Sequence, residues 1–99
     1  MHEWHLYLVR TREGSLYTGI ATDVARRMNE HEQPGHKGAK YLRSKGPLEL
    51  AYQTRIGERS LALRAEHCVK KLTKEEKEDI VTRTPAGEEL LKILGLHDD

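Results

Sequence analysis

The sequence has no phenylalanine, a single cysteine and almost no excess of charge of one sign. Because Cys68 has no partner cysteine, an internal disulfide is excluded, and we expect a reducing compartment, the cytoplasm. Without phenylalanine, the core must consist of aliphatic side chains, tyrosines and Trp4. The formal net charge of +1 excludes a general attraction of the whole surface to nucleic acid, although it allows a local basic patch.

Longer sequence signals are missing as well. No apolar run approaches the ~18 residues of a membrane span, and the N-terminal region carries no signal-peptide pattern, so we expect no membrane contact. Phosphate-binding glycine motifs are absent, which leaves nucleotide cofactors without support. The six histidines lack the spacing of a zinc site. The 99 residues are enough for one domain.

Three segments alternate between apolar and polar residues as strands do: residues 4–10, 15–20 and 48–56. The polar segment between the first two ends in Gly14, which predicts a hairpin turn. Because two hairpin strands are followed by a third, we expect a small, mostly antiparallel sheet.

Helices are predicted in four places: from an N-cap at Thr22 or Asp23 to His31, from Ser60 to Leu72, from a capping box of Thr73 and Glu76 to Val81, and from Thr84, with Pro85 in the first turn, to just before Gly95. The fold class is therefore α+β, a three-stranded sheet flanked by helices. We expect residues 1–83 to form the main domain, with residues 84–99 as a short C-terminal helix and tail packed on it.

The first predicted helix carries an arginine on its apolar side. Val24, Arg27, Met28 and His31 are spaced i, i+3, i+4, i+7, so they share one face. A buried guanidinium is rare unless it is paired. One interpretation is that Arg27 is aimed at a phosphate group. The other is that Arg27 extends along the helix and pairs with a surface carboxylate.

Glu66 lies at the border of the apolar stripe of the second predicted helix. A carboxylate beside a core is costly unless a cation neutralises it. That cation is either a divalent metal ion, since Mg²⁺ often binds only one or two carboxylates and keeps several waters, or an arginine or lysine in a structural ion pair. Cys68 lies near the same stripe, and we interpret it as part of the core rather than as a nucleophile.

Tyr7 and Tyr17 flank the predicted hairpin. An odd number of turn residues places them directly opposite each other on one face, and an even number places them on opposite faces. A pair of phenols beside a metal ion can orient a water molecule or accept its proton. The alternative is that both are ordinary strand aromatics.

The segment between the first helix and the third strand contains no acidic residue from Gln33 to Leu48. It is rich in basic side chains, with one aromatic and three glycines that permit a close approach of the backbone. The candidate nucleic-acid-binding residues are His36, Lys37, Lys40, Tyr41, Arg43 and Lys45. They predict a track for a phosphate backbone. The alternative is an ordinary solvated basic loop.

The order of these features resembles the GIY-YIG endonuclease family, in particular its small stand-alone bacterial branch. The first motif is matched by His5-Leu6-Tyr7 and the second by Tyr17-Thr18-Gly19. Arg27, His31 and Glu66 follow where the family has its arginine, its His or Tyr, and its metal-binding glutamate. His5 stands where the family usually has glycine, and the late asparagine of homing-type members has no clear counterpart.

The resemblance covers about residues 3 to 82 and implies a GIY-YIG fold that hydrolyses a phosphodiester bond with one Mg²⁺ or Mn²⁺ ion. It implies that Glu66 holds the ion and that Arg27 stabilises the charge of the transition state. It also implies that Tyr17 or Tyr7 positions the attacking water or takes its proton, and that His31 assists the proton transfer.

The function that this resemblance implies is an endonuclease acting on branched, damaged or weakly sequence-specific DNA, in DNA repair or processing. Members that cut defined targets carry an added recognition domain, which these residues do not supply, so a protein partner is a candidate source of targeting. The alternative is a nucleic-acid-binding module with little or no cleavage. A carboxylate such as Glu66 would weaken a pure binder by repelling phosphate, which favours the enzyme. A third hypothesis is a protein-interaction domain that docks through the apolar residues 90–96.

Overall fold

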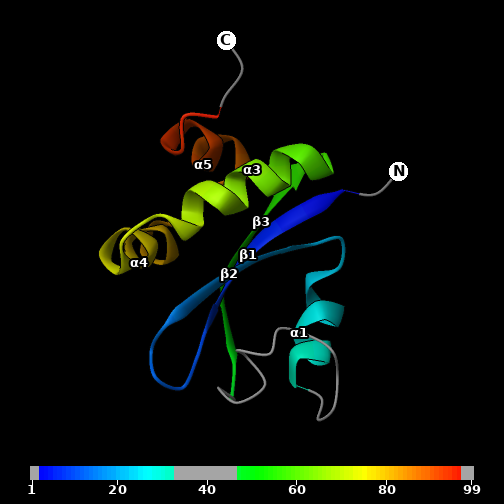
Figure 1. Cartoon of the computed structure of the whole chain (residues 1–99), viewed down its shortest axis with the longest axis vertical. Helices are drawn as coiled ribbons and strands as arrows, with labels where there is room; N and C mark the ends of the chain where they lie inside the picture. The colour runs from blue at the N-terminus through cyan, green and yellow to red at the C-terminus, as the bar shows by residue number, and fades with distance from the viewer. Residues whose placement is uncertain (1–2, 33–46, 97–99) are drawn as a thin grey trace.

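The computed structural model describes residues 3–32 and 47–96. A hairpin of β1 (Trp4–Arg10) and β2 (Leu16–Ala21) leads into α1 (Val24–Glu32), and β3 (Glu49–Gly57) then completes the sheet. The helices α3 (Arg59–Lys70), α4 (Lys74–Arg83) and α5 (Gly87–Ile93) follow (Figure 1). The strand order is β2-β1-β3 and both pairings are antiparallel. This architecture confirms the predicted α+β class.

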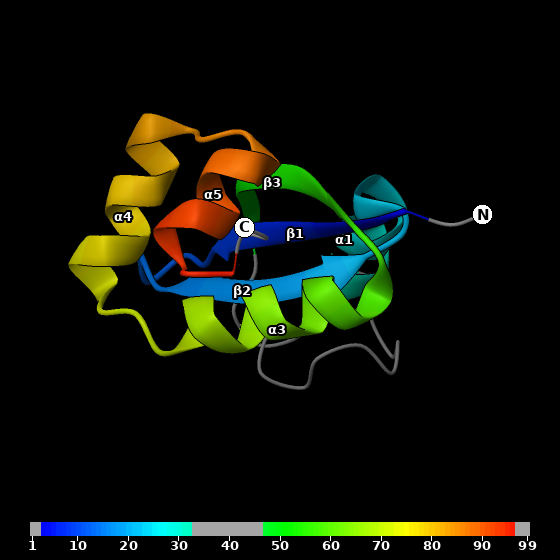
Figure 2. The same cartoon turned by 90° about the horizontal axis from the view of Figure 1, so that it is seen from above.

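The two faces of the sheet have different helical covers. On one face Leu6 and Leu8 of β1 pack with Val69 of α3, Ile80 of α4 and Leu90 of α5. Figure 2 shows these three helices around the sheet, with α1 lying apart from them. None of the helices in the described segments is long and apolar enough to cross a membrane.

The other face of β1 presents Tyr7 and Val9, which cluster with Val24 of α1 and have Tyr17 and Met28 packed against them. Because successive side chains of a strand point to opposite faces, β1 serves both clusters at once. This second face is the one that α1 covers, and it carries the two tyrosines of the motifs.

The hairpin turn contains five residues, 11–15, closed by hydrogen bonds from the backbone N–H of Thr11 to the Ser15 carbonyl and from that of Gly14 to the Thr11 carbonyl, both at 2.9 Å. The odd number puts Tyr7 and Tyr17 on one face, as predicted. They are not directly opposite, however, because Tyr7 pairs with Gly19 and Tyr17 with Val9. Tyrosines directly opposite each other would need a turn centred one residue earlier. Tyr7 and Tyr17 are instead diagonal neighbours.

Two predicted helix starts are confirmed by their caps. The backbone N–H of Arg26 donates to Asp23 Oδ1 at 3.0 Å, which makes Asp23 the N-cap of α1. Thr73 and Glu76 form the reciprocal capping box of α4, with hydrogen bonds of 2.9 and 3.1 Å.

The predicted start of the last helix is wrong. Its N-cap is Ala86 and its first residue is Gly87, so Pro85 lies outside α5. The carbonyl of Pro85 instead accepts a hydrogen bond from the Tyr52 hydroxyl at 2.7 Å. A Cβ on Gly87 would lie 2.1 Å from the Arg55 carbonyl oxygen, so α5 begins where a glycine lets the chain touch β3.

Candidate active site

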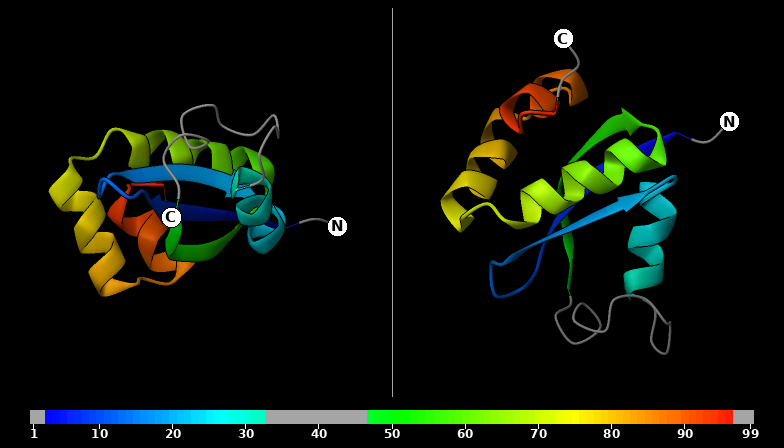
Figure 3. Two further views of the ribbon diagram at one scale, coloured as in Figure 1. Left: turned by 90° about the horizontal axis from the view of Figure 1, so that it is seen from below. Right: turned by 45° about the horizontal axis from the view of Figure 1, so that its top comes forward.

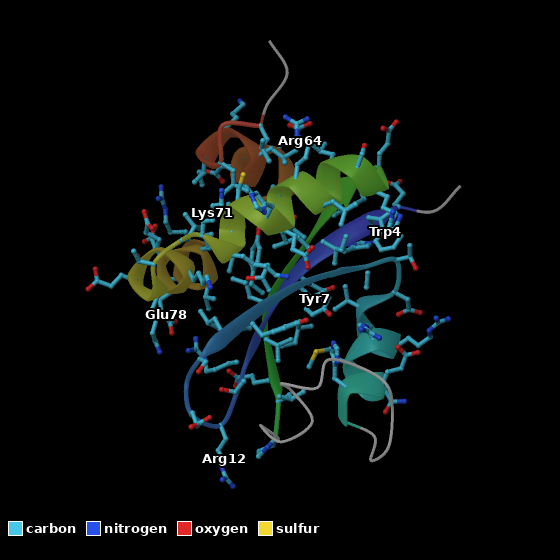
Figure 4. The ribbon with its side chains drawn as sticks, viewed as in Figure 1. Trp4, Tyr7, Arg12, Arg64, Lys71 and Glu78 are labelled. Carbon is cyan, nitrogen blue, oxygen red and sulfur yellow. The ribbon has the colours of Figure 1, made fainter. Side chains whose placement is uncertain are left out.

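The site is centred on Tyr7, which is 2% exposed. Its hydroxyl and Nε2 of His31, a residue in the last turn of α1, are hydrogen-bonded at 3.1 Å. Opposite Tyr7 on β2 lies Gly19, where a Cβ would come within 2.5 Å of the Tyr7 hydroxyl and ring. The phenol therefore occupies space that only glycine leaves open. Figure 4 shows Tyr7 between α1 and α3.

The imidazole of His31 lies between the two phenols. Its ring centroid is 6.4 Å from that of Tyr7 and 6.2 Å from that of Tyr17, the latter in an edge-on arrangement. Like Tyr7, His31 is 2% exposed and is largely shielded from water, whereas Tyr17 is partly exposed. The helical spacing that placed His31 on the inner face of α1 is thus confirmed.

Arg27 lies one turn before His31 and keeps 36% of its side chain exposed. Its Nη1 donates to Glu30 Oε1 at 3.2 Å. Burial alone would lower the pKa of Arg27, but Glu30 and Tyr7 outweigh it and the pKa is raised. One of the two interpretations of Arg27, that it pairs with a carboxylate, is therefore observed. The guanidinium also interacts with Tyr7.

Burial raises the pKa of Tyr7 above its ordinary value, against the opposing effect of the Arg27 guanidinium. The neighbouring Tyr17 and Glu66 add smaller contributions in the raising direction. Ionisable groups on α1, β2 and α3 thus influence one phenol. The structure brings Tyr7, Tyr17, Arg27 and His31 together on one face, with Glu66 close enough to affect it.

Glu66 acts on Tyr7 from α3, a helix that contacts the edge strand β2 and lies alongside it (Figure 3). Its side chain is 19% exposed, and Oε2 lies 3.5 Å from Nζ of Lys70, one turn later. This is the lysine pair that was the structural interpretation of Glu66. Because Lys70 is 52% exposed, the pair contributes little to stability, about 0.2–1 kcal/mol.

The side chains of the site can be compared with the ligands that different metal ions prefer. Within residues 3–32 and 47–96, no three His, Cys, Asp or Glu side chains gather as a ligand set of the kind that zinc requires. A single half-buried carboxylate fits a hard cation such as Mg²⁺, which keeps several waters and takes further oxygens from a phosphate. Glu66 is such a carboxylate.

Some predicted residues lie outside the described part of the chain: His36, Lys37, Lys40, Tyr41, Arg43 and Lys45. Conversely, the sequence reasoning missed Glu30, which contacts both Arg26 and Arg27 at 3.5 and 3.2 Å. Its i+4 and i+3 spacing from these arginines was the available signal. The reasoning also missed why Gly19 must be glycine, because that depends on the strand register.

The chain matches the model of the GIY-YIG catalytic domain over residues 3–79. The protein belongs to the GIY-YIG family. Among its relatives is the UPF0213 protein YhbQ of Salmonella arizonae, 56% identical over 94 residues that make up 95% of this chain and 92% of the relative. The corresponding protein of Escherichia coli is 53% identical over the same coverage.

Two solution NMR structures resemble this GIY-YIG protein over nearly their whole length. The UPF0213 protein BH0048 from Bacillus halodurans is 34% identical with a TM-score of 0.53, covering 98% of this chain and all of that one. The protein EF2693 from E. faecalis is 30% identical with a TM-score of 0.54, covering all of this chain and 96% of that one. The predicted family and fold are confirmed. Family membership supports a nuclease in general, whereas the relatives' names specify no substrate or pathway.

Proposed function

We propose that this protein is a divalent-metal-dependent endonuclease that hydrolyses phosphodiester bonds in branched, damaged or otherwise non-standard DNA, in DNA repair or processing. The observation that carries the proposal is the buried hydrogen bond between the Tyr7 hydroxyl and His31, flanked by Arg27 and influenced by Glu66. A structural core has no need for a guanidinium and a carboxylate at such a pair.

Tyr7 would orient the attacking water. Because burial raises its pKa, Tyr7 is a neutral phenol near pH 7 and can hydrogen-bond to water. When His31 carries its proton on Nδ1, its Nε2 accepts the Tyr7 proton while the phenol oxygen takes one from the water. Tyr17, on the same face, is the second candidate for this role.

Arg27 would bind the phosphate and stabilise the negative charge that builds on its oxygens. Its Glu30 contact then competes with the substrate, since a carboxylate and a phosphate oxygen use the same donors. Glu66 would hold one Mg²⁺ or Mn²⁺ ion. When bound, such an ion supplies Lewis-acid stabilisation of the same phosphate charge.

Cleavage of labelled single-stranded, duplex and branched nucleic acids, both DNA and RNA, tests the proposal. We expect cleavage with Mg²⁺ or Mn²⁺ that EDTA abolishes. Glu66→Ala and Arg27→Ala should each reduce the rate by roughly 100- to 1,000-fold, as for the loss of a group that stabilises transition-state charge. Matched controls are Glu88→Ala and Arg64→Ala, which remove exposed residues of the same charge on α5 and α3. They should cleave like the wild type.

The second candidate, a binding module, predicts a different result. The wild type would then cleave none of the substrates with either ion, and Glu66→Ala would bind DNA as tightly as the wild type or more tightly. That combination would overturn the nuclease proposal. If the isolated protein cleaves all the substrates at similar rates, we further propose that a protein partner directs it to its target.

A further inference from the structure

A hollow of about 280 Å³ lies beside the candidate active site and has no role in the chemistry proposed above. It opens between the start of β1, the end of β2 and the first turns of α1, and Arg27 lines both the hollow and the active site. The other lining residues are Trp4, Ile20, Ala21, Thr22, Asp23, Arg26 and Glu30.

One part of the lining is aromatic and apolar. Trp4, the only tryptophan of the chain, is partly exposed there, and the Arg59 guanidinium lies over its ring at 5.5 Å from the centroid. The partly buried Ile20 of β2 lines the hollow with it. Figure 4 shows Trp4 beyond Tyr7 along β1, toward the start of α3. A planar ring and an aliphatic side chain together form a surface on which a nucleobase can stack.

The other part of the lining is cationic. Arg26 is 75% exposed and Arg27 is 36% exposed, and Glu30 contacts both guanidiniums. Neither contact with Glu30 is closed off from solvent, so an anion of higher charge can replace the carboxylate. A phosphate group, which accepts several charge-assisted hydrogen bonds, suits this pair of arginines.

We propose that this hollow binds the nucleotide next to the phosphate that is cleaved, with its base against Trp4 and Ile20 and its own phosphate on Arg26. The proposal rests on the proposed function in one respect, because it takes Arg27 to hold the reacting phosphate. The volume lies just below the range of about 300–1,000 Å³ of small-molecule sites, which suits one nucleotide rather than two. The hollow thereby gives a small domain a contact with a base.

Binding can be measured without cleavage. Trp4 is a unique fluorescent reporter, so its emission can be titrated in EDTA with 5′-mononucleotides, in deoxyribose and ribose forms, with the matching nucleosides and with inorganic phosphate. We expect mononucleotides to change the Trp4 emission strongly, and phosphate alone to leave it nearly unchanged. The two sugar forms show whether the hollow prefers DNA or RNA.

Variants separate the two ends of the hollow. Arg26→Gln should weaken mononucleotide binding roughly fivefold, as for the loss of one ion pair at a solvent-exposed side chain, while the exposed control Arg64→Gln should not change it. Thr22→Tyr puts a larger side chain at an exposed position of the lining and should abolish the mononucleotide response without lowering the unfolding temperature. Amide shifts of residues 20–23 in a nitrogen-15 NMR titration provide a readout independent of the tryptophan.

The proposal is overturned if phosphate and mononucleotides change Trp4 emission equally, because the hollow would then bind an anion without contacting a base. It is also overturned if neither ligand produces a response or an amide shift at residues 20–23. A protein that cleaves DNA but gives either result keeps the nuclease function and loses the nucleotide site. A protein that gives the mononucleotide response but never cleaves keeps the site and loses the nuclease function.

Discussion

At the scale of single residues, the position of the Tyr7 hydroxyl depends on one missing side chain. A Cβ at Gly19 would lie 2.5 Å from both the ring and the hydroxyl of Tyr7. Gly19→Ala must therefore push the phenol away from His31. We expect the cleavage rate to fall at least ~100-fold, as for a displaced catalytic group, with a loss of about 1–3 kcal/mol in the free energy of unfolding from overpacking. Cleavage assays and denaturant titrations measure the two effects.

Tyr7→Phe is the control for this variant. It removes the hydroxyl without adding an atom to the packed face, so it should lose a similar share of activity with a smaller loss of stability. An active Gly19→Ala protein with wild-type kinetics would show that the hydrogen bond between Tyr7 and His31 is not used in catalysis.

Glu30 contacts the Arg27 guanidinium at 3.2 Å. If Arg27 binds phosphate as we propose, the Glu30 carboxylate competes with it, so Glu30→Gln should tighten the binding of DNA by roughly two- to fivefold, the scale of a partly exposed ion pair. Glu88→Gln makes the same change of charge at an exposed site on α5 and should leave binding unchanged. Anisotropy titrations in EDTA at fixed salt report both. If Glu30→Gln weakens binding instead, Glu30 serves to position Arg27.

The helical spacing of α1 correctly predicted that Arg27 and His31 accompany Val24 on its inner face. The pairing of Tyr7 with Gly19 was beyond such reasoning, because a hairpin register depends on where the turn is centred, and the polar residues before Gly14 allow more than one centre. For the same reason the steric need for Gly19 emerged only from the structure.

At the scale of elements, Tyr52 ties β3 to the segment that precedes α5. It is 5% exposed and donates to the Pro85 carbonyl. Burial raises its pKa to about 12, whereas an unfolded tyrosine titrates near 10. The neutral phenol thus stabilises the fold fully below pH 10, and this contribution is lost as the pH rises toward 12. In that window it falls by about 1.4 kcal/mol per pH unit.

Tyr52→Phe removes both the hydrogen bond and the titration. Its free energy of unfolding should lie about 1 kcal/mol below that of the wild type at pH 7. The difference should shrink and reverse between pH 10 and 12, since phenylalanine has no proton to lose. Denaturant titrations of both proteins across this pH range give their free energies of unfolding. The difference between the two proteins removes the effect of the other titrating groups, which both proteins share. A constant difference would mean that Tyr52 does not titrate in this window.

The elements themselves were predictable where the signal is local. Asp23 and the pair of Thr73 and Glu76 act through hydrogen bonds within three residues, and both caps were found from the sequence. The prediction that Pro85 lies in the first turn of the last helix was wrong because contacts with distant residues decide its position. Tyr52 donates a hydrogen bond to its carbonyl, and the contact of Gly87 with β3 decides where α5 begins. Such contacts join residues more than thirty positions apart.

At the scale of the whole molecule, the alternation along β1 produces two different faces, one with Leu6 and Leu8 and one with Tyr7 and Val9. Which helix covers which face was not predictable, since the apolar stripes of the helices are chemically alike. The consequence is that α1 covers the face that carries the candidate active site. The helices α3 to α5 cover the other face and form the main core there, without any phenylalanine.

The match to the family ends at residue 79, yet the main core extends beyond it. Leu90 of α5 is 0% exposed and packs with Leu6, Leu8 and Ile80. Truncating one such leucine to alanine costs about 2–5 kcal/mol, a large part of the ~5–15 kcal/mol that a domain has in total. A chain ending at Arg83 should therefore lose cooperative thermal unfolding and, with it, the proposed cleavage. A chain ending at Leu96 is the control for shortening and should retain both. If the chain ending at Arg83 unfolds at nearly the wild-type temperature, residues 84–99 are an appendage rather than part of the same domain.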